Sequence, residues 1–357
     1  MSYLLLLIGL AMVLLGAHAL TDGAAAIATR FRIPQLVIGL TIVAFGTSAP
    51  ELIVSTSSAL RGSTDMAIAN IVGSNLFNTL MLVGVTALFA PIVVQHRTLR
   101  LEIPLCILAS VVLFVMADDK LMDGSLTNLV SRSDGFVLLA FFLIFLSYSY
   151  TIASGSRKGQ LERLKYAEPD SKSLHTISTQ TANSQESVLQ ESVSDDVIES
   201  IDVLPTPPMW RNILFFLVGL ALLVLGGDIF VSSASDIAYA WGVSEAIIGL
   251  TLVAVGTSLP ELATSIVAAL KKNPELAIGN AIGSNLMNIF LILGLSSTLC
   301  PLELGNVRIS DLALLVVASI ILWIVALFFG QRTITRVEGI VLILLYVAYM
   351  LFRVFVN

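Results

Sequence analysis

The sequence has little charge, and this scarcity excludes an ordinary soluble domain. Charged residues make up 12% of the 357 residues and hydrophobic residues 56%, whereas soluble domains are about 25% charged. The net charge of −6 says little about partners, because many of the acidic residues lie in one polar segment. The composition is typical of a membrane protein.

Cysteine and histidine are also scarce. The two cysteines, Cys106 and Cys300, form no disulfide framework and no zinc-ligand spacing, and we expect them to be small buried residues. The chain has no phosphate-binding glycine motif, no Ser–His pair and no paired aspartates within its apolar segments. We therefore expect neither enzymatic activity nor a resident cofactor.

Apolar runs of about 20 residues, the length that crosses a bilayer, recur along nearly the whole chain. They predict an all-α polytopic membrane protein with ten transmembrane helices, at about 3–20, 35–60, 67–90, 101–117, 135–153, 212–233, 245–270, 274–299, 310–329 and 337–355. The N-terminal stretch lacks the basic region of a cleavable signal and is interpreted as the first span.

A polar segment divides the spans into two sets of five. Residues 155–209 are rich in Ser, Thr, Gln and acids, which predicts a flexible cytoplasmic linker. It separates a first five-helix repeat, 1–154, from a second, 210–357. The linker lacks the glycine turn and alternating oxygen ligands of a calcium-binding EF-hand loop, so we interpret it as a tether rather than a sensor.

Basic residues predict the orientation. With both termini outside, 14 of the 19 Lys and Arg residues fall in cytoplasmic segments and five outside, as the positive-inside rule requires. Such a protein without a targeting sequence suits a prokaryotic inner membrane.

Two segments occur twice, 210 residues apart. Residues 39–57 and 249–267 are identical at 12 of 19 positions, and residues 67–84 and 277–294 at 9 of 18. Because each repeat has an odd number of spans, the second copy enters the membrane from the opposite face, which predicts inverted repeats.

The first repeated motif, Gly-Thr-Ser-x-Pro-Glu, places Glu51 and Glu261 within apolar segments. Intramembrane carboxylates are costly and typically mark an ion or proton path. Proline and glycine weaken the helix here, so we expect carbonyl groups nearby to be freed from helical pairing. These carbonyls, and the hydroxyls spaced to share a face with the glutamates, belong to Ala44, Thr47, Ser48, Ala254, Thr257 and Ser258.

The second motif, Gly-Ser-Asn-Leu-x-Asn, adds hydroxyl and amide groups. Its spacing allows Ser74 with Asn78, and Ser284 with Asn288, to face one point. Asn75 and Asn285 lie off that line, where they can cap or cross-link broken helices. For either motif alone, a simple helix kink or close helix packing is the competing interpretation. Because both motifs occur in both halves at matched spacing, we favour a functional ion site over these structural interpretations.

The combined donors are all oxygen, which suits hard cations such as Ca²⁺ and Na⁺ and disfavours zinc or copper. Two glutamates carry charge −2, which one Ca²⁺ or two Na⁺ would neutralise. Two other acids, Glu102 and Asp311, lie at span ends, where we expect them to face water or lipid headgroups.

The paired motifs GTSAPEL…GSNLFN and GTSLPEL…GSNLMN resemble the two alpha-repeats of the calcium/cation antiporter superfamily, and within it prokaryotic sodium/calcium exchanger-like proteins. The resemblance covers both membrane halves but not the linker. It implies ten helices, of which the second, third, seventh and eighth surround four cation sites, while the first and sixth slide to alternate access.

By motif position, the resemblance implies that Glu51 and Glu261 bind calcium with the Thr47 and Thr257 carbonyls. The implied sodium ligands are Ser48, Ser74 and the Ala44 carbonyl on one side, and Ser258, Ser284 and the Ala254 carbonyl on the other, with Asn78 and Asn288 in the middle. Several members, notably potassium-dependent exchangers, carry aspartate where this chain has Asn288, so potassium co-transport is not expected.

The leading hypothesis is therefore a secondary antiporter that exchanges Ca²⁺ for Na⁺, with these ions as substrates, the lipid bilayer as its surroundings and no obligate protein partner. A Ca²⁺/H⁺ antiporter using the same two glutamates is the alternative, because a desolvated carboxylate binds protons more readily. A cation channel is a third hypothesis, which inverted repeats disfavour.

Overall fold

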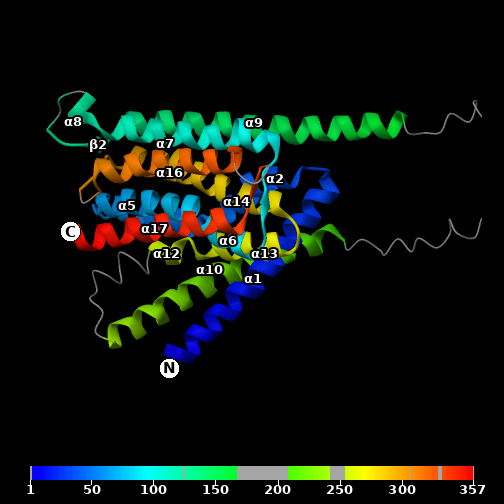
Figure 1. Ribbon diagram of the computed structural model, residues 1–357, viewed down its shortest axis with the longest axis horizontal. Coiled ribbons are helices and arrows are strands. Elements are labelled where there is room, and N and C mark those ends of the chain that lie inside the picture. The colour runs from blue at the N-terminus through cyan, green and yellow to red at the C-terminus, as the bar shows by residue number, and fades with distance from the viewer. Residues whose placement is uncertain are drawn as a thin grey trace, which may run out of the picture.

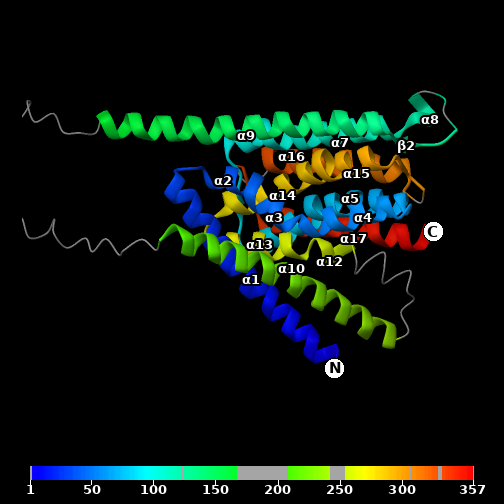
Figure 2. The same cartoon turned by 180° about the vertical axis from the view of Figure 1, so that it is seen from behind.

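The computed structural model describes residues 2–122, 124, 126–166, 208–241, 254–305, 307–328 and 332–356. The described part is mostly helical, with long helices side by side along one axis (Figure 1). From behind, the same packing is visible, and α1 and α10 slant away from the other helices (Figure 2).

The first half of the chain contains one broken helix and several π-helical turns, labelled η. Its elements are α1 (Ser2–Phe31), α2 (Gln35–Ile38), η1 (Gly39–Val43), α3 (Ala44–Thr47), α4 (Ala49–Leu60), α5 (Thr64–Leu76), η2 (Phe77–Leu82), α6 (Val83–Phe89), β1 (Ile92–Val93), η3 (Thr98–Glu102), α7 (Ile103–Ala117), α8 (Asp119–Met122), β2 (Leu129–Val130) and α9 (Arg132–Tyr166).

The second half follows a similar order where it is described, with the single helix α16 in place of η3 and α7. Its elements are α10 (Met209–Ala240), α12 (Ala254–Thr257), α13 (Leu259–Leu270), α14 (Pro274–Leu286), η6 (Met287–Leu293), α15 (Gly294–Leu299), β3 (Leu302–Glu303), α16 (Ile309–Phe328), β4 (Thr333–Ile334) and α17 (Arg336–Val356).

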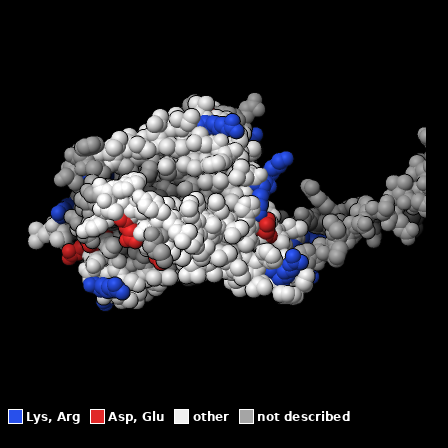
Figure 3. Space-filling view, turned by 90° about the horizontal axis from the view of Figure 1, so that it is seen from below, with Lys and Arg blue, Asp and Glu red and all other residues white. Residues whose placement is uncertain are grey.

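Seven helices of the described part are long and apolar enough to cross a membrane, and the bent segment Gln35–Leu60 makes an eighth if it is one span. Seen from below, the surface carries Lys, Arg, Asp and Glu mostly toward its two ends, with a white band between them (Figure 3). Such a band is what a bilayer requires, and the chain is an integral membrane protein. Part of the expected span 245–270 lies outside the described residues.

Two short strand pairs join the halves crosswise. β1 of the first half pairs antiparallel with β4 of the second, and β2 pairs with β3. Each pair is extended by one further backbone bond, from Val94 N–H to the Arg332 carbonyl (2.8 Å) and from Leu304 N–H to the Asn128 carbonyl (3.2 Å). The halves are therefore interlocked at two places.

The helices that carry the repeated motifs form the buried centre. The helices that carry the second motif each contain an apolar stretch of 18 residues, as does Arg132–Gly155. The buried share of that stretch is 94% in Pro274–Leu299 and 78% in Thr64–Phe89, against 22% in Arg132–Gly155. The helices that carry the second motif are thus shielded from lipid by the surrounding helices, which is where polar groups can be tolerated in a membrane.

Helices α1 and α10 pack against each other through glycines. A Cβ atom added to Gly16 would lie 2.8 Å from the Gly219 carbonyl oxygen, and one added to Gly226 would lie 2.9 Å from the Val13 nitrogen. Small residues allow such close backbone approach in membrane helix pairs. The two helices therefore form a tight pair beside the central helices.

Some expectations change with the structure. Glu102 and Asp311 do not face water: their exposed fractions are 0% and 4%, because each is paired inside the protein. Tyr148 donates to Glu102 (2.7 Å) and Tyr349 to Asp311 (3.4 Å).

Helix α9 continues to Tyr166, beyond the expected start of the linker at 155, and residues 167–207 of that linker lie outside the described residues. Cys106 is buried, as expected, and Cys300 is half-buried.

Candidate cation site

Both Gly-Thr-Ser-x-Pro-Glu motifs break their helix at the serine. Ser48 separates α3 from α4, and Ser258 separates α12 from α13, with φ and ψ of −83° and 9° and of −90° and 5°. The segments on either side of Ser48 are bent by 49°. A proline follows each break in the first turn of the new helix, where its missing N–H costs nothing.

The breaks place one carboxylate at the start of each new helix. Glu51 lies in the first turn of α4 and Glu261 in the first turn of α13. Both are completely buried, with an exposed fraction of 0%. The positive end of the helix dipole stabilises a carboxylate at this position, although two buried negative charges still require positive partners.

Serine hydroxyls cross between the halves to reach these carboxylates. Ser258 donates to Glu51 Oε1 (3.0 Å), and Ser48 donates to Glu261 Oε1 (2.8 Å). Within each half, the second motif supplies a further donor: Ser74 to Glu51 Oε1 (3.3 Å) and Ser284 to Glu261 Oε1 (3.5 Å). The two repeats therefore build one site together.

A second layer of paired side chains supports the breaks. Thr47 Oγ1 donates to Asn280 Oδ1 (3.2 Å), and Thr257 Oγ1 donates to Asn70 Oδ1 (3.3 Å). The amide nitrogens of the same asparagines donate to serines of the neighbouring helix, Asn280 to Ser265 (3.1 Å) and Asn70 to Ser55 (3.0 Å).

The sequence analysis did not select Asn70 and Asn280. The available signal was their identity at matched positions in the repeated segments AIAN and AIGN. Each holds a motif threonine of the opposite half through its oxygen, and a serine of its own half through its nitrogen.

The remaining asparagines link the second motifs. Asn75 donates to the Asn285 carbonyl (3.3 Å), Asn288 donates to Asn75 Oδ1 (2.9 Å), and Asn285 donates to Thr79 Oγ1 (2.8 Å). The predicted cross-linking role of Asn75 and Asn285 is confirmed.

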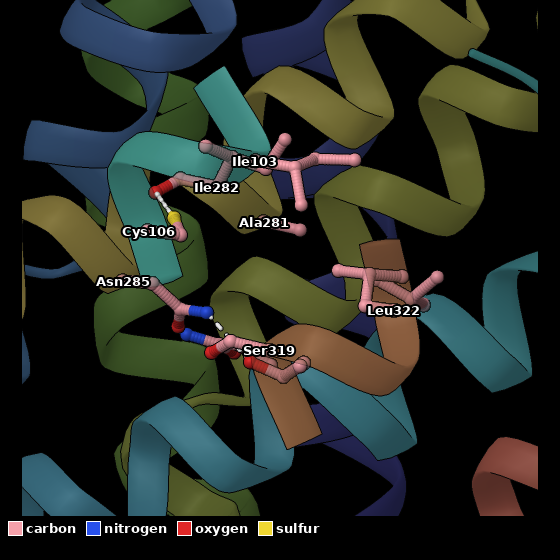
Figure 4. A pocket seen from close by; sticks show the side chains of 10 residues that line it. Ile103, Cys106, Ala281, Ile282, Asn285, Ser319 and Leu322 are labelled. Carbon is pink, nitrogen blue, oxygen red and sulfur yellow. Dashed lines mark hydrogen bonds between the residues drawn. The ribbon is translucent and has the colours of Figure 1, made fainter. Parts of the chain in front are cut away.

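Asn78 is different, because both polar atoms of its buried side chain have no hydrogen-bond partner among the described residues. It lines a small cavity with Cys106, Asn285 and Ser319, which has room for about one water molecule. Figure 4 shows Cys106, Asn285 and Ser319 around this space, from α7, α14 and α16. Ser74 donates to Glu51, while Asn78 has no hydrogen-bond partner among the described residues, so the prediction that the two face one cation stays a prediction.

The predicted freeing of the Ala44 carbonyl is wrong. Its oxygen accepts a hydrogen bond from the Ser48 N–H (2.9 Å), because the chain turns tightly at Ser48 instead of unwinding. The Thr47 hydroxyl also lies within hydrogen-bond distance of this oxygen (3.4 Å). Ala254 begins α12, at the matching place in the second half.

Several buried oxygens in this region lack a hydrogen-bond partner in the described part of the chain, namely Glu51 Oε2, Glu261 Oε2, Asn78 Oδ1, Asn285 Oδ1 and Asn288 Oδ1. Leaving buried polar atoms unpaired is costly, so such atoms indicate a missing positive partner. The described residues contain no cluster of three or more His, Cys, Asp or Glu suited to a metal. The donors fit a hard cation held by carboxylate, hydroxyl and amide oxygens.

Comparisons with known proteins agree on one family. The family described as "Sodium/calcium exchanger protein" matches residues 1–151 and 211–355. The inner membrane protein YrbG of Escherichia coli K12 is 34% identical over 89% of this chain and 86% of its own. The sodium/calcium exchanger MaX1 of Methanosarcina acetivorans is 29% identical over 98% of this chain and 97% of its own.

Among solved structures, the chain is similar to the sodium-calcium exchanger NCX_Mj soaked with Na⁺ and Sr²⁺. The TM-score is 0.74 at 27% identity, covering 97% of this chain and 96% of that one.

Proposed function

The chain belongs to the sodium/calcium exchanger protein family, and we propose that it is an antiporter that expels or admits Ca²⁺ in exchange for Na⁺ by alternating access. Membership of this family supports cation transport by antiport across the membrane.

One observation carries this proposal: two completely buried carboxylates, one from each half, with one oxygen of each held by serines of both halves and the other unpaired. A charge of −2 in this space matches one Ca²⁺ or two Na⁺. Because both ions would need the same carboxylates, they would exclude each other, which is the requirement for exchange.

The proposed residue roles are those that the resemblance to the calcium/cation antiporters implies. Glu51 and Glu261, with the carbonyls of Thr47 and Thr257, are proposed to hold Ca²⁺. Flanking Na⁺ positions would use Ser48, Ser74 and the Ala44 carbonyl on one side, and Ser258, Ser284 and the Ala254 carbonyl on the other. Asn78 and Asn288 would complete the middle of the site.

The proposed architecture is ten helices in two inverted five-helix repeats, with both termini outside and the linker in the cytoplasm. The matched order of elements and the crosswise strand pairs support it. In this arrangement, the α1–α10 pair would slide past the buried centre to open the site to either side.

Exchange of Ca²⁺ for H⁺ at the same carboxylates is the second candidate. Complete burial favours it, because a carboxylate removed from water holds a proton more readily.

Uptake of ⁴⁵Ca²⁺ into proteoliposomes separates the two candidates. Vesicles are loaded with Na⁺ or with K⁺, and a third set carries an imposed pH gradient. We expect uptake in the Na⁺-loaded vesicles alone. Uptake driven only by the pH gradient would assign the protein to proton exchange, and currents through single open pores would make it a channel.

A further inference from the structure

An open groove lies away from the buried carboxylates, where α7 and α16 pack together. It measures about 440 Å³ and is lined by His96, Leu99, Arg100, Pro104, Trp323, Leu327 and Arg332. This volume falls within the range of about 300–1,000 Å³ of small-molecule sites. One end of the groove is cationic and the other is apolar.

The backbone fixes Trp323 in this groove. Leu99 lies in the π-turn η3, in which a carbonyl pairs with the N–H five residues later. That position is Pro104, which has no N–H. The indole Nε1 of Trp323 donates to the Leu99 carbonyl instead, at 2.9 Å. The ring is therefore held between the two helices, and Trp is a residue favoured at the membrane–water interface.

Within the described part of the chain, no carboxylate pairs with the cationic end. The ion pairs seen there include Arg97–Glu102, Lys271–Asp22 and Arg353–Asp311, and none of these involves Arg100 or Arg332. The described residues that line the groove include no acidic side chain. Arg100 and His96 are exposed, and Arg332 is half-buried. These side chains are available to an anion.

Apolar stripes continue from the groove along both helices. Ile320, Ile324 and Leu327 of α16 are 37%, 39% and 36% exposed, and their spacing places them on one face. On α7, Leu108 is 46% exposed, one turn after Pro104. A ligand whose anionic group meets the arginines can thus lay a hydrocarbon chain along these stripes.

We propose that this groove is a binding site for an anionic phospholipid, whose phosphate lies between His96, Arg100 and Arg332 and whose acyl chains follow α7 and α16 past Trp323. The positive-inside rule puts this end at the cytoplasmic leaflet, where anionic lipids attract basic residues. Charge and shape together favour a lipid over a free anion, because the groove opens onto an apolar surface.

Fluorescence quenching of Trp323 tests this proposal directly. The full chain carrying Trp210→Phe and Trp241→Phe keeps Trp323 as its one tryptophan. It is placed in vesicles that contain brominated phosphatidylglycerol or, at the same fraction, brominated phosphatidylcholine. We expect stronger quenching by phosphatidylglycerol, and a preference that falls by about 20-fold in Arg100→Gln/Arg332→Gln, since each charge contributes roughly 5-fold.

The matched control is Arg61→Gln/Lys120→Gln, which removes two exposed charges outside the groove and should keep the preference. Equal quenching by the two lipids in the unsubstituted background overturns the proposal without any groove variant. A preference that survives in Arg100→Gln/Arg332→Gln also overturns it. Loss of the preference on adding inorganic phosphate would assign the groove to a free anion.

Discussion

The two halves of the chain are alike around the carboxylates and different in the middle. Glu51 and Glu261 each receive one serine from their own half and one from the other. Asn78 and Asn288 occupy matched positions, yet Asn288 donates to Asn75 while Asn78 has no partner among the described residues. The hydrogen bonds are thus symmetric around the two carboxylates and asymmetric between the asparagines of the second motifs.

Neutralising either glutamate tests the symmetric part and should have the largest effect. We expect Glu51→Gln and Glu261→Gln each to lower ⁴⁵Ca²⁺ uptake by about 100-fold or more, because each removes half of the buried charge that a cation must satisfy. Glu303→Gln, an exposed acid in β3, is the control. Near-normal uptake in either buried variant would show that the two carboxylates are not a joint site.

The crosswise serines come next. Ser48→Ala and Ser258→Ala each remove a hydroxyl from the carboxylate of the opposite half, a charge-assisted bond. We expect both to weaken the apparent affinity for Ca²⁺ by a similar factor of about 10. Ser57→Ala is the control, because the Ser57 hydroxyl makes no side-chain hydrogen bond within the described part of the chain, and it should leave affinity unchanged. Strongly unequal effects would mean that the halves do not contribute equivalently.

The asparagines test the asymmetric part through stability rather than transport. Asn288→Ala leaves Asn75 Oδ1 buried without its donor, so we expect a loss of about 1–3 kcal/mol in unfolding free energy. Asn78→Ala breaks no hydrogen bond within the described residues and should cost less. Chemical unfolding in detergent without Ca²⁺ or Na⁺ measures both, and equal losses would contradict the assigned difference.

A smaller difference lies where α13 ends beside α1. Lys271, after α13, donates to Asp22 of α1 (2.6 Å) and to the His18 carbonyl (3.2 Å). The aligned residues of the other half are Arg61 and Ser232, which cannot form an ion pair. The contact ties α1 to the centre on one side of the membrane.

We expect Lys271→Gln and Asp22→Asn to change transport rates by up to about 5-fold, since Asp22 is 65% exposed and exposed pairs contribute about 0–1 kcal/mol. A double-mutant cycle measures the coupling, and Arg61→Gln is the matched control. Additive single effects would show that the pair does not hold α1.

The features that lie in the repeated motifs could be predicted from the sequence. The two glutamates, the serines beside them and the broken helix all follow from one motif seen twice. The crosswise pairing of Ser48 with Glu261 could not be predicted, because it depends on how the halves pack. The direction of the Asn78 side chain could not be predicted either. The π-turn η2 begins at Phe77 and changes the helical phase on which i,i+4 arguments depend. The Ala44 carbonyl stayed paired since the break is one residue wide.

The crosswise strand pairs bear on when the protein can become functional during synthesis. The first half is translated first, yet β1 has no partner until β4 at Thr333–Ile334 has been made, and Glu51 has no Ser258. A ribosome that stops early therefore releases a chain with an open strand edge and half of its carboxylate ligands. Completion of the contacts around Glu51 and of the β1 strand edge therefore waits for synthesis of the second half.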